Sequence, residues 1–93
     1  MIIRIVRMEF KLDKMDEFEQ FFQTIQQKIL DQPGCQAVRL HKDASHPNIW
    51  YTYSHWDSQA DLETYRHSEL FATSWAKAKS LFGGKPMAFS LVE

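Results

Sequence analysis

The chain contains little cysteine, glycine or proline. Its 93 residues include one cysteine, three glycines and three prolines. A lone cysteine cannot form an internal disulfide, so the composition fits a reducing compartment. We interpret Cys35 as a packing residue, with a reactive thiol as the alternative. Three glycines are also too few for a glycine-rich phosphate-binding loop.

The chain also lacks an excess of either charge. Eleven Lys and Arg stand against 12 Asp and Glu, which gives a formal charge of -1. Nucleic acids and anionic membranes attract basic surfaces, so we expect neither as a partner. The start Met1–Arg7 lacks the apolar run of a signal peptide, and no later run could span a bilayer. We expect a cytoplasmic protein with a single domain over residues 1–93.

Motifs for metal binding and nucleophilic catalysis are absent. The sequence has no His-x-x-x-His, no cysteine pair and no Gly-x-Ser-x-Gly. The four histidines fall on different predicted elements: His41, His46, His55 and His67. We therefore predict no metal site and no cofactor.

Hydrophobic periodicity predicts alternating strands and helices. Period-two segments predict strands over residues 1–12, 36–42, 49–56 and 85–93. Apolar residues recur at helical spacing over residues 13–31 and again from 58, with a bend and restart at Ser68-Glu69. Asp13 and Ser58 are the predicted N-caps, and Ser58 with Asp61 resembles a capping box. The order β-α-β-β-α-β predicts an α+β, ferredoxin-like fold: a four-stranded antiparallel sheet with the helices on one face.

The first predicted strand has two apolar faces. One face carries the residues expected to contact the helices: Ile2, Val6, Met8, Phe10 and Leu12. Ile3 and Ile5 lie on the other face, and we assign Ala88 and Val92 of the last strand to that same face. An apolar, helix-free face would be exposed to water, so we predict a homodimer in which two sheets face each other.

Large rings with polar atoms are concentrated between Asn48 and Trp75. This stretch holds all three tryptophans, all three tyrosines and two of the four histidines. Such rings either pack in a core or line a ligand pocket.

Several short motifs follow one another along the chain: Lys14-Met-Asp-Glu-Phe18, Gln32-Pro-Gly-Cys35, Trp56-Asp-Ser58, Ala60-Asp-Leu62 with Tyr65, and Ser68-Glu-Leu-Phe71. Together they resemble the antibiotic biosynthesis monooxygenase family of the dimeric α/β-barrel superfamily. The resemblance covers nearly the whole chain and implies a dimer with a pocket in each subunit between sheet and helices. The family's enzymes include quinone-forming monooxygenases that need neither metal nor flavin, and a haem-degrading branch, while many members have no known activity.

The resemblance departs from both enzymatic branches at polar positions. Haem-degrading members have an Asn where this chain has Val6, a Trp at Tyr65 and a His ligand at Trp75, so the iron ligand is missing. Many other members have His-Phe where this chain has Leu70-Phe71, and an acid near Ser54. The resemblance therefore favours oxidation without haem but transfers no catalytic residue directly.

We predict a pocket lined by the substrate-binding residues Trp56, Tyr65, Phe71 and Trp75. Tyr65 and His67 are the catalytic candidates, because a phenol or neutral imidazole can exchange a proton with a substrate. The alternatives are core packing for the rings and a solvent-facing helix end for His67.

The predicted function is a monooxygenase that oxidises a small aromatic, quinol-like or polyketide-like molecule with O2. The alternative is a non-catalytic dimer that binds a small ligand, or a stress-linked protein of the same fold. The two differ in whether Tyr65 or His67 points into an open cavity.

Overall fold

The structure is a computed structural model that describes residues 1–93. Its elements, in order, are β1 (Ile2–Glu9), α1 (Met15–Leu30), β2 (Cys35–Lys42), β3 (Ile49–Trp56), α2 (Gln59–Arg66), α3 (Glu69–Ser80) and β4 (Met87–Val92). The predicted order is confirmed, and the second helical stretch is divided into α2 and α3 as the restart at Ser68 indicated.

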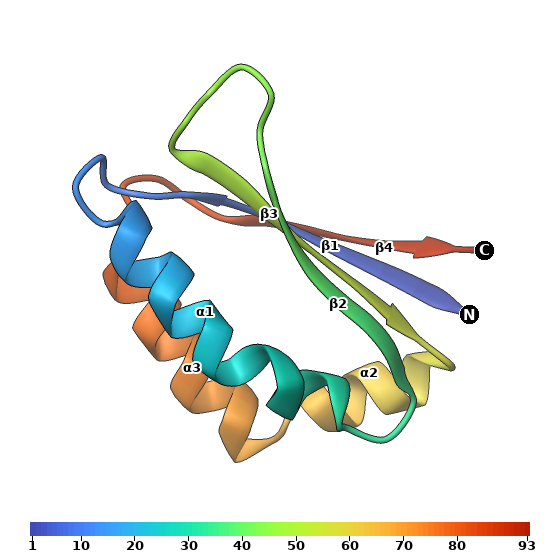
Figure 1. Cartoon of the computed structure of the whole chain (residues 1–93). Coiled ribbons are helices and arrows are strands. Elements are labelled where there is room, and N and C mark those ends of the chain that lie inside the picture. The colour runs from blue at the N-terminus through green and yellow to red at the C-terminus, as the bar shows by residue number, and fades with distance from the viewer.

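The four strands form one antiparallel sheet in the order β2-β3-β1-β4. All three helices lie on one side of it (Figure 1). This is the α+β, ferredoxin-like arrangement that the sequence predicted. The opposite side of the sheet has no helix over it (Figure 1).

Helix α1 covers the sheet with an apolar stripe. Its buried residues are Phe18, Phe22, Ile25 and Ile29, spaced at three and four positions. Two predictions near its start are wrong. Lys14, not Asp13, is the N-cap, and it makes no side-chain capping bond. Leu12 does not continue the inward face of β1 but is 74% exposed, because the strand ends at Glu9 and the chain turns there.

Serine caps set the boundaries of α2 and α3. The Ser58 Oγ accepts a hydrogen bond from the Asp61 backbone N–H at 3.1 Å, which confirms the predicted capping. The Ser68 Oγ accepts from the Phe71 N–H at 3.1 Å and starts α3. Each cap satisfies an N–H that would otherwise lack a partner, so the chain changes direction between the two helices without leaving buried donors unpaired.

The family-like motifs at the start of β2 and the end of β3 contact each other. The Asp57 N–H donates to the Gly34 carbonyl at 2.8 Å, and Cys35 pairs with Trp56 in the sheet. Gly34 has φ of 81°, and a Cβ there would collide with the Asp61 side chain. Glycine is required at this turn for both reasons. The two motifs together fix the junction from which α2 begins.

The register corrects the predicted face of β4. Residues directly opposite in a sheet share a face, and Ile3 and Ile5 pair with Leu91 and Phe89. Ala88 instead pairs with Val6, on the side of the helices. The helix-free face therefore carries Met87, Phe89 and Leu91 of β4. The prediction failed because both alternating sets of β4 contain apolar residues, so the pattern alone does not set its phase.

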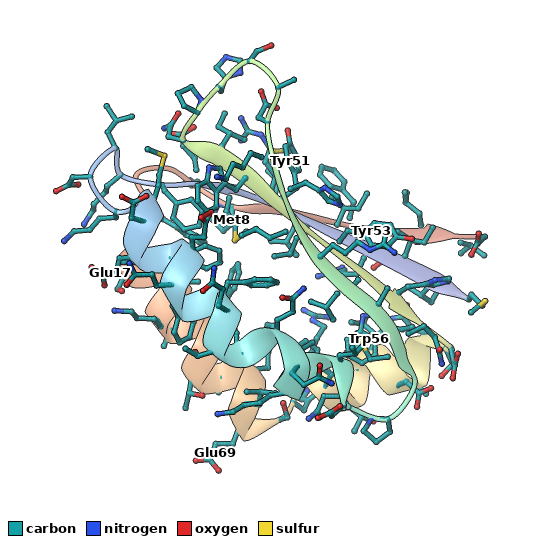
Figure 2. All side chains as sticks on the ribbon, viewed as in Figure 1. Met8, Glu17, Tyr51, Tyr53, Trp56 and Glu69 are labelled. Carbon is teal, nitrogen blue, oxygen red and sulfur yellow. The ribbon has the colours of Figure 1, made fainter.

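Tyr51 and Tyr53 also belong to the helix-free face. They pair with Arg7 and Ile5, whereas Trp50 pairs with Met8 on the buried side. Figure 2 shows Met8 directed toward the helices and the two tyrosines on the other side of the sheet. This alternation leaves Met8 2% and Trp50 3% exposed.

Candidate active site between the sheet and the helices

A cavity of about 330 Å³ lies between the helix-facing side of the sheet and the three helices. Fourteen of its 19 lining residues are hydrophobic. The five others are Arg4, Thr52, Ser54, Arg66 and Ser74. This volume and this mixture of apolar walls with a few polar groups are typical of small-molecule sites.

Three of the predicted substrate-binding residues come together on one wall. Tyr65, Phe71 and Trp75 all line the cavity from α2 and α3. The rings of Tyr65 and Phe71 meet edge to face with centroids 5.3 Å apart, and Phe71 stacks on Trp75 at 6.0 Å. These are favourable aromatic geometries, and they hold a continuous ring surface toward the cavity.

Trp56, the fourth predicted substrate-binding residue, does not line the cavity. It is 0% exposed and stacks on Tyr65 with ring centroids 5.0 Å apart. Its indole Nε1–H donates to the Ser54 Oγ at 2.9 Å. In Figure 2 Trp56 lies beneath the end of the sheet, toward α2. Trp56 thus supports Tyr65 and Ser54 from behind, and both of these face the cavity.

The Tyr65 hydroxyl has no hydrogen-bond partner in the chain, while its ring is half-buried. Burial, and to a lesser degree the neighbouring Cys35, raises the pKa of Tyr65 to about 12. A phenol with this pKa stays protonated at neutral pH, so it can donate a hydrogen bond but is a poor base. The structure therefore favours Tyr65 as a donor to a ligand oxygen.

His67 is not part of the cavity lining. It is exposed at the C-cap of α2, and its Nδ1 lies 2.7 Å from the Glu63 carbonyl oxygen. That contact makes Nδ1 the protonated nitrogen of a neutral ring, because a carbonyl only accepts. The structure does not bring His67 together with Tyr65 at the cavity surface, and its catalytic role stays a prediction.

Sequence reasoning missed Arg4, which lines the cavity from β1. Arg4 pairs with Ser54 on β3 and with Ser90 on β4, so a polar row crosses the helix-facing side of the sheet. Its Nη1 donates to the Ser90 Oγ at 2.8 Å. A signal was present in the sequence. Arg4, Val6 and Met8 occupy every second position of the strand, so Arg4 lies on the same buried face, where a charged residue is unusual.

Arg66 is the second arginine that the sequence analysis overlooked. It ends α2, lines the cavity, and is paired through Nη1 with the Glu63 carboxylate at 2.9 Å. Burial first, and then the Arg66 charge, lowers the pKa of the Arg4 guanidinium. Arginine remains protonated after such a shift, so the cavity retains two cations.

The cavity lining contains no histidine, aspartate, glutamate or lysine. No group of three or more His, Cys, Asp or Glu side chains is placed to hold a metal ion. Burial raises the pKa of Cys35, which keeps this thiol protonated. The groups able to act on a ligand in the cavity are therefore hydroxyls and guanidiniums.

The model of the antibiotic biosynthesis monooxygenase family matches residues 1–76. The chain belongs to this family. No curated protein sequence matches it significantly.

Several solved structures share the fold of this chain at low sequence identity. A protein from Nitrosomonas europaea titled "Putative antibiotic biosynthesis monooxygenase" has TM-score 0.91 and 15% identity, with 100% of this chain and 98% of that chain covered. A protein from Caulobacter crescentus CB15 with the same description has TM-score 0.90 and 21% identity, covering 99% and 90%. A conserved protein from Methanosarcina mazei Go1 has TM-score 0.91 and 17% identity, covering 99% and 92%.

Membership of the antibiotic biosynthesis monooxygenase family supports a monooxygenase-like function in general terms. The fold agrees along the full chain, but identities of this size transfer the fold and not the substrate. None of the helices has both the length and the apolar character needed to cross a bilayer.

Proposed function

We propose that the protein is a monooxygenase that oxidises a small, flat aromatic molecule, quinol-like or polyketide-like, with O2 and without metal or flavin. The observation that supports this most directly is the aromatic wall of the cavity. Tyr65, Phe71 and Trp75 present ring surfaces to the space, and the Tyr65 hydroxyl is free to bind an oxygen atom of the ligand. A flat apolar ligand would replace water along this wall.

The proposed reaction balances with substrate and O2 alone. For an anthrone-like substrate, a ring CH2 group becomes C=O. One oxygen atom of O2 enters this carbon, and the other leaves as water with the two hydrogens. The substrate loses four electrons, and O2 accepts them. The electron donor is the substrate's anion, so the protein has to favour that anion.

The cavity residues suit this task of anion stabilisation. Tyr65, with its raised pKa, donates a hydrogen bond to the substrate oxygen rather than removing a proton. The guanidiniums of Arg4 and Arg66 add positive charge beside the same space. Apolar walls strengthen both interactions by excluding water. His67 remains the predicted proton acceptor, acting from the helix end outside the lining.

Oxygen uptake tests this proposal. Purified protein, with no added metal or flavin, is assayed against hydroquinones and anthrone-like phenols, and spontaneous oxidation is subtracted. Tyr65→Phe removes one donor to the oxyanion and is expected to lower the protein-dependent rate roughly a hundredfold. His67→Ala tests the predicted base in parallel. No uptake above background across the panel would contradict the proposal.

One observation favours a second candidate function, a non-catalytic protein that binds a small ligand. The lining contains no histidine, carboxylate or lysine, so the usual acids and bases of catalysis are missing from the cavity surface. On this alternative the cavity binds an aromatic molecule without uptake of O2. Mass spectrometry of the native protein would then find a co-purifying ligand that the Trp75→Ala variant loses.

We also propose that a second copy of the chain covers the helix-free face of the sheet, in a cytoplasmic homodimer. Phe89 and Leu91 are 45% and 49% exposed on this face, beside Ile3 and Ile5. Such a patch is expected to pair with its own copy.

Light scattering of two variants tests the homodimer. Phe89→Arg places a charge within the helix-free face and is expected to give monomers. Val92→Arg on the same strand, directed to the other side and 84% exposed, is the matched control and should leave the mass unchanged. A monomeric wild type would refute the assembly.

A further inference from the structure

We propose that the cavity binds its ligand as an anion: an aromatic molecule whose single negatively charged oxygen group lies between Arg4 and Arg66. This deepens the proposed function and rests on the cavity being the ligand site. It names a property of the ligand, its charge, that the fold and the family leave open. It applies whether the ligand is oxidised or only bound.

The charges of the cavity lining are of one sign. Arg4 and Arg66 are its only charged residues, and no carboxylate accompanies them in the lining. The whole chain, by contrast, has a formal charge of -1. The positive character is therefore local to the cavity, where apolar walls weaken screening by water.

Arg4 is the stronger indication, because it is a half-buried cation with no carboxylate in salt-bridge contact. The nearby Glu63 raises the pKa of Arg4 less than burial and Arg66 lower it. Arg4 forms no salt bridge, and its one side-chain hydrogen bond goes to the neutral Ser90 hydroxyl. Burying a charge without a partner is costly, and proteins normally pair such groups. A guanidinium with free donors suits a carboxylate or phenolate oxygen.

The position of Arg4 also suits a binding role. Its backbone lies in the central part of the sheet, paired on both sides by β3 and β4. A side chain held by two neighbouring strands is well placed for a fixed contact. The proximity of a second cation, Arg66, disfavours the charged state of Arg4, and a bound anion would offset that repulsion.

Arg66 brings the second cation from the opposite layer. Its Nη1 is engaged by Glu63, but the pair is exposed, with side chains 41% and 39% accessible, and exposed pairs bind weakly. The remaining donors of its guanidinium make no bond within the chain. Arg66 directly follows Tyr65, so the cation and the free hydroxyl enter the cavity from the same helix end. The Glu63 carboxylate orients Arg66, and its attraction for Arg4 is smaller than the opposing effects of burial and Arg66, which lower the pKa of Arg4.

Calorimetry with charged and neutral naphthalene probes tests the inference. The probes are 2-naphthoate, 2,4-dinitro-1-naphtholate and the neutral 2-naphthamide, at neutral pH and fixed salt. We expect at least one of the two anions to bind wild type about tenfold or more tightly than the amide. Comparison of the two anions shows whether a carboxylate or a phenolate is preferred.

Variants identify the residue responsible. Arg4→Gln is expected to weaken binding of the preferred anion roughly 10- to 100-fold and to leave 2-naphthamide unchanged. Arg4→Lys should retain most of the preference and shows that charge, not only packing, matters. Lys28→Gln removes one positive charge from an exposed position on α1 outside the lining and is the matched control. Circular dichroism confirms that each variant is folded.

Three results would overturn the inference: equal affinity of wild type for the anions and the amide, equal losses of both in Arg4→Gln, or no binding of any probe. The oxygen-uptake assay separates this failure from failure of the proposed function. Uptake with neutral hydroquinones but no preference for anions removes only the charge assignment. A clear preference for anions without any uptake removes the oxidation and keeps the anion site.

Discussion

The two ends of the layer between sheet and helices are built from the same kind of residue but differ in packing. At one end Phe10, Phe18, Trp50 and Phe82 form a filled cluster, in which the first three are 1–3% exposed. At the other end Tyr65, Phe71 and Trp75 surround a cavity of about 330 Å³. Trp75 contacts Phe82 at 5.6 Å and joins the two. Aromatic content alone therefore does not distinguish a core from a site.

The difference lies in where the rings originate and what faces them. In the filled cluster, rings from α1, β3 and the segment after α3 converge on Phe10, which directly follows β1. The cavity is lined by Tyr65, Phe71 and Trp75 of α2 and α3 and by rings of α1, including Phe18, which borders both ends. Its lining also includes the small side chains Ser74, Ala78 and Ala88. Small residues beside a wall of rings leave space that the rings cannot fill.

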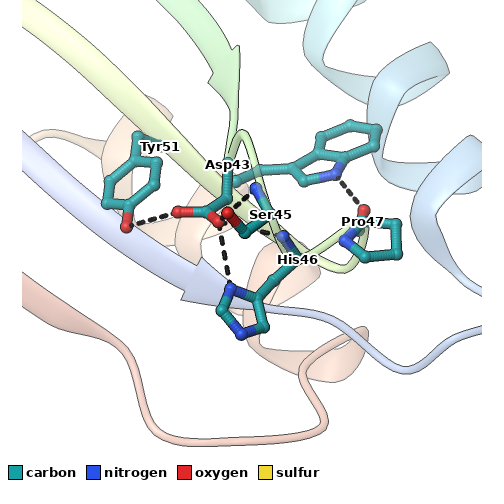
Figure 3. A network of polar contacts seen from close by, with 6 residues as sticks. Asp43, Ser45, His46, Pro47 and Tyr51 are labelled. Carbon is teal, nitrogen blue, oxygen red and sulfur yellow. Dashed lines mark hydrogen bonds and ion pairs between the residues drawn. The ribbon is translucent and has the colours of Figure 1, made fainter.

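Polar groups differ between the two ends in the same way. In the turn between β2 and β3, beside the filled end, the Asp43 carboxylate accepts bonds from the Ser45 N–H, the His46 N–H and the Tyr51 hydroxyl, as Figure 3 shows. The Trp50 indole donates to the Pro47 carbonyl at 2.8 Å. At the cavity, the Arg4 charge and the Tyr65 hydroxyl have no such partners. Polar groups left unpaired beside a cavity are the ones available to a ligand.

The largest effect is expected when one ring is removed from each end. Phe10→Ala should lower the free energy of unfolding by about 3–5 kcal/mol, because a cavity forms in a filled cluster. Trp75→Ala should cost only about 1–2 kcal/mol, because its ring already borders empty space. Urea denaturation of both variants at one fixed protein concentration measures the difference.

Equal losses in the two variants would break the comparison, since they would mean that both ends contribute alike to the core. Phe71→Leu is a useful control because it keeps apolar volume at the cavity wall. Its unfolding free energy is expected to lie close to that of the wild type.

Much of the fold could be predicted because its signals are local. The period of α1, the caps at Ser58 and Ser68, and the turn at Pro33-Gly34 each follow from neighbouring residues. The face of β4 and the exposed Leu12 could not be predicted in this way. Both depend on strand register and on where β1 ends, which pairing with distant residues decides.

The candidate site was predictable only in part. Tyr65, Phe71 and Trp75 were predicted as substrate-binding residues, and all three line the cavity; that they bind a substrate stays a prediction. Trp56 and His67 were selected for their chemistry, but neither lines the cavity. Tyr65 stacks on Trp56 and separates it from the space, and His67 lies exposed at the C-cap of α2. Arg4 was not assigned to either face in the sequence analysis, and its place in the cavity lining follows from the strand register.

Filling the cavity with a larger side chain tests the same comparison between the two ends, and we expect a smaller change in stability than for removal of a ring. Ala88 lines the space from β4, and Ala88→Leu is expected to lower affinity for 2-naphthamide about tenfold while raising the free energy of unfolding by up to about 1 kcal/mol. Val92→Leu, on the same side of β4 but outside the lining, is the matched control. Unchanged affinity in Ala88→Leu would show that ligands do not occupy this space.

The smallest effect concerns the paired charges near the filled end. Hydrogen bonds from the Ser45 N–H and from His46 lower the pKa of Asp43 from 3.8 to about 2. A lowered pKa means that the ionised form favours the folded state, so its contribution is present above about pH 4 and is lost as pH falls toward 2. Asp43→Asn should therefore melt below wild type at pH 6, and the two melting temperatures should converge by pH 2.

Thermal unfolding between pH 6 and pH 2 measures this convergence. Subtracting the melting temperature of the variant from that of the wild type at each pH removes the contribution of the other carboxylates. Asp57→Asn is the control: this carboxylate accepts bonds only from the Gln36 side chain, so its melting-temperature difference should be smaller. A difference for Asp43→Asn that stays constant with pH would mean that the turn is held by its shape and not by the charge. The contrast between paired polar groups at the filled end and unpaired ones at the cavity would then rest on Arg4 and Tyr65 alone.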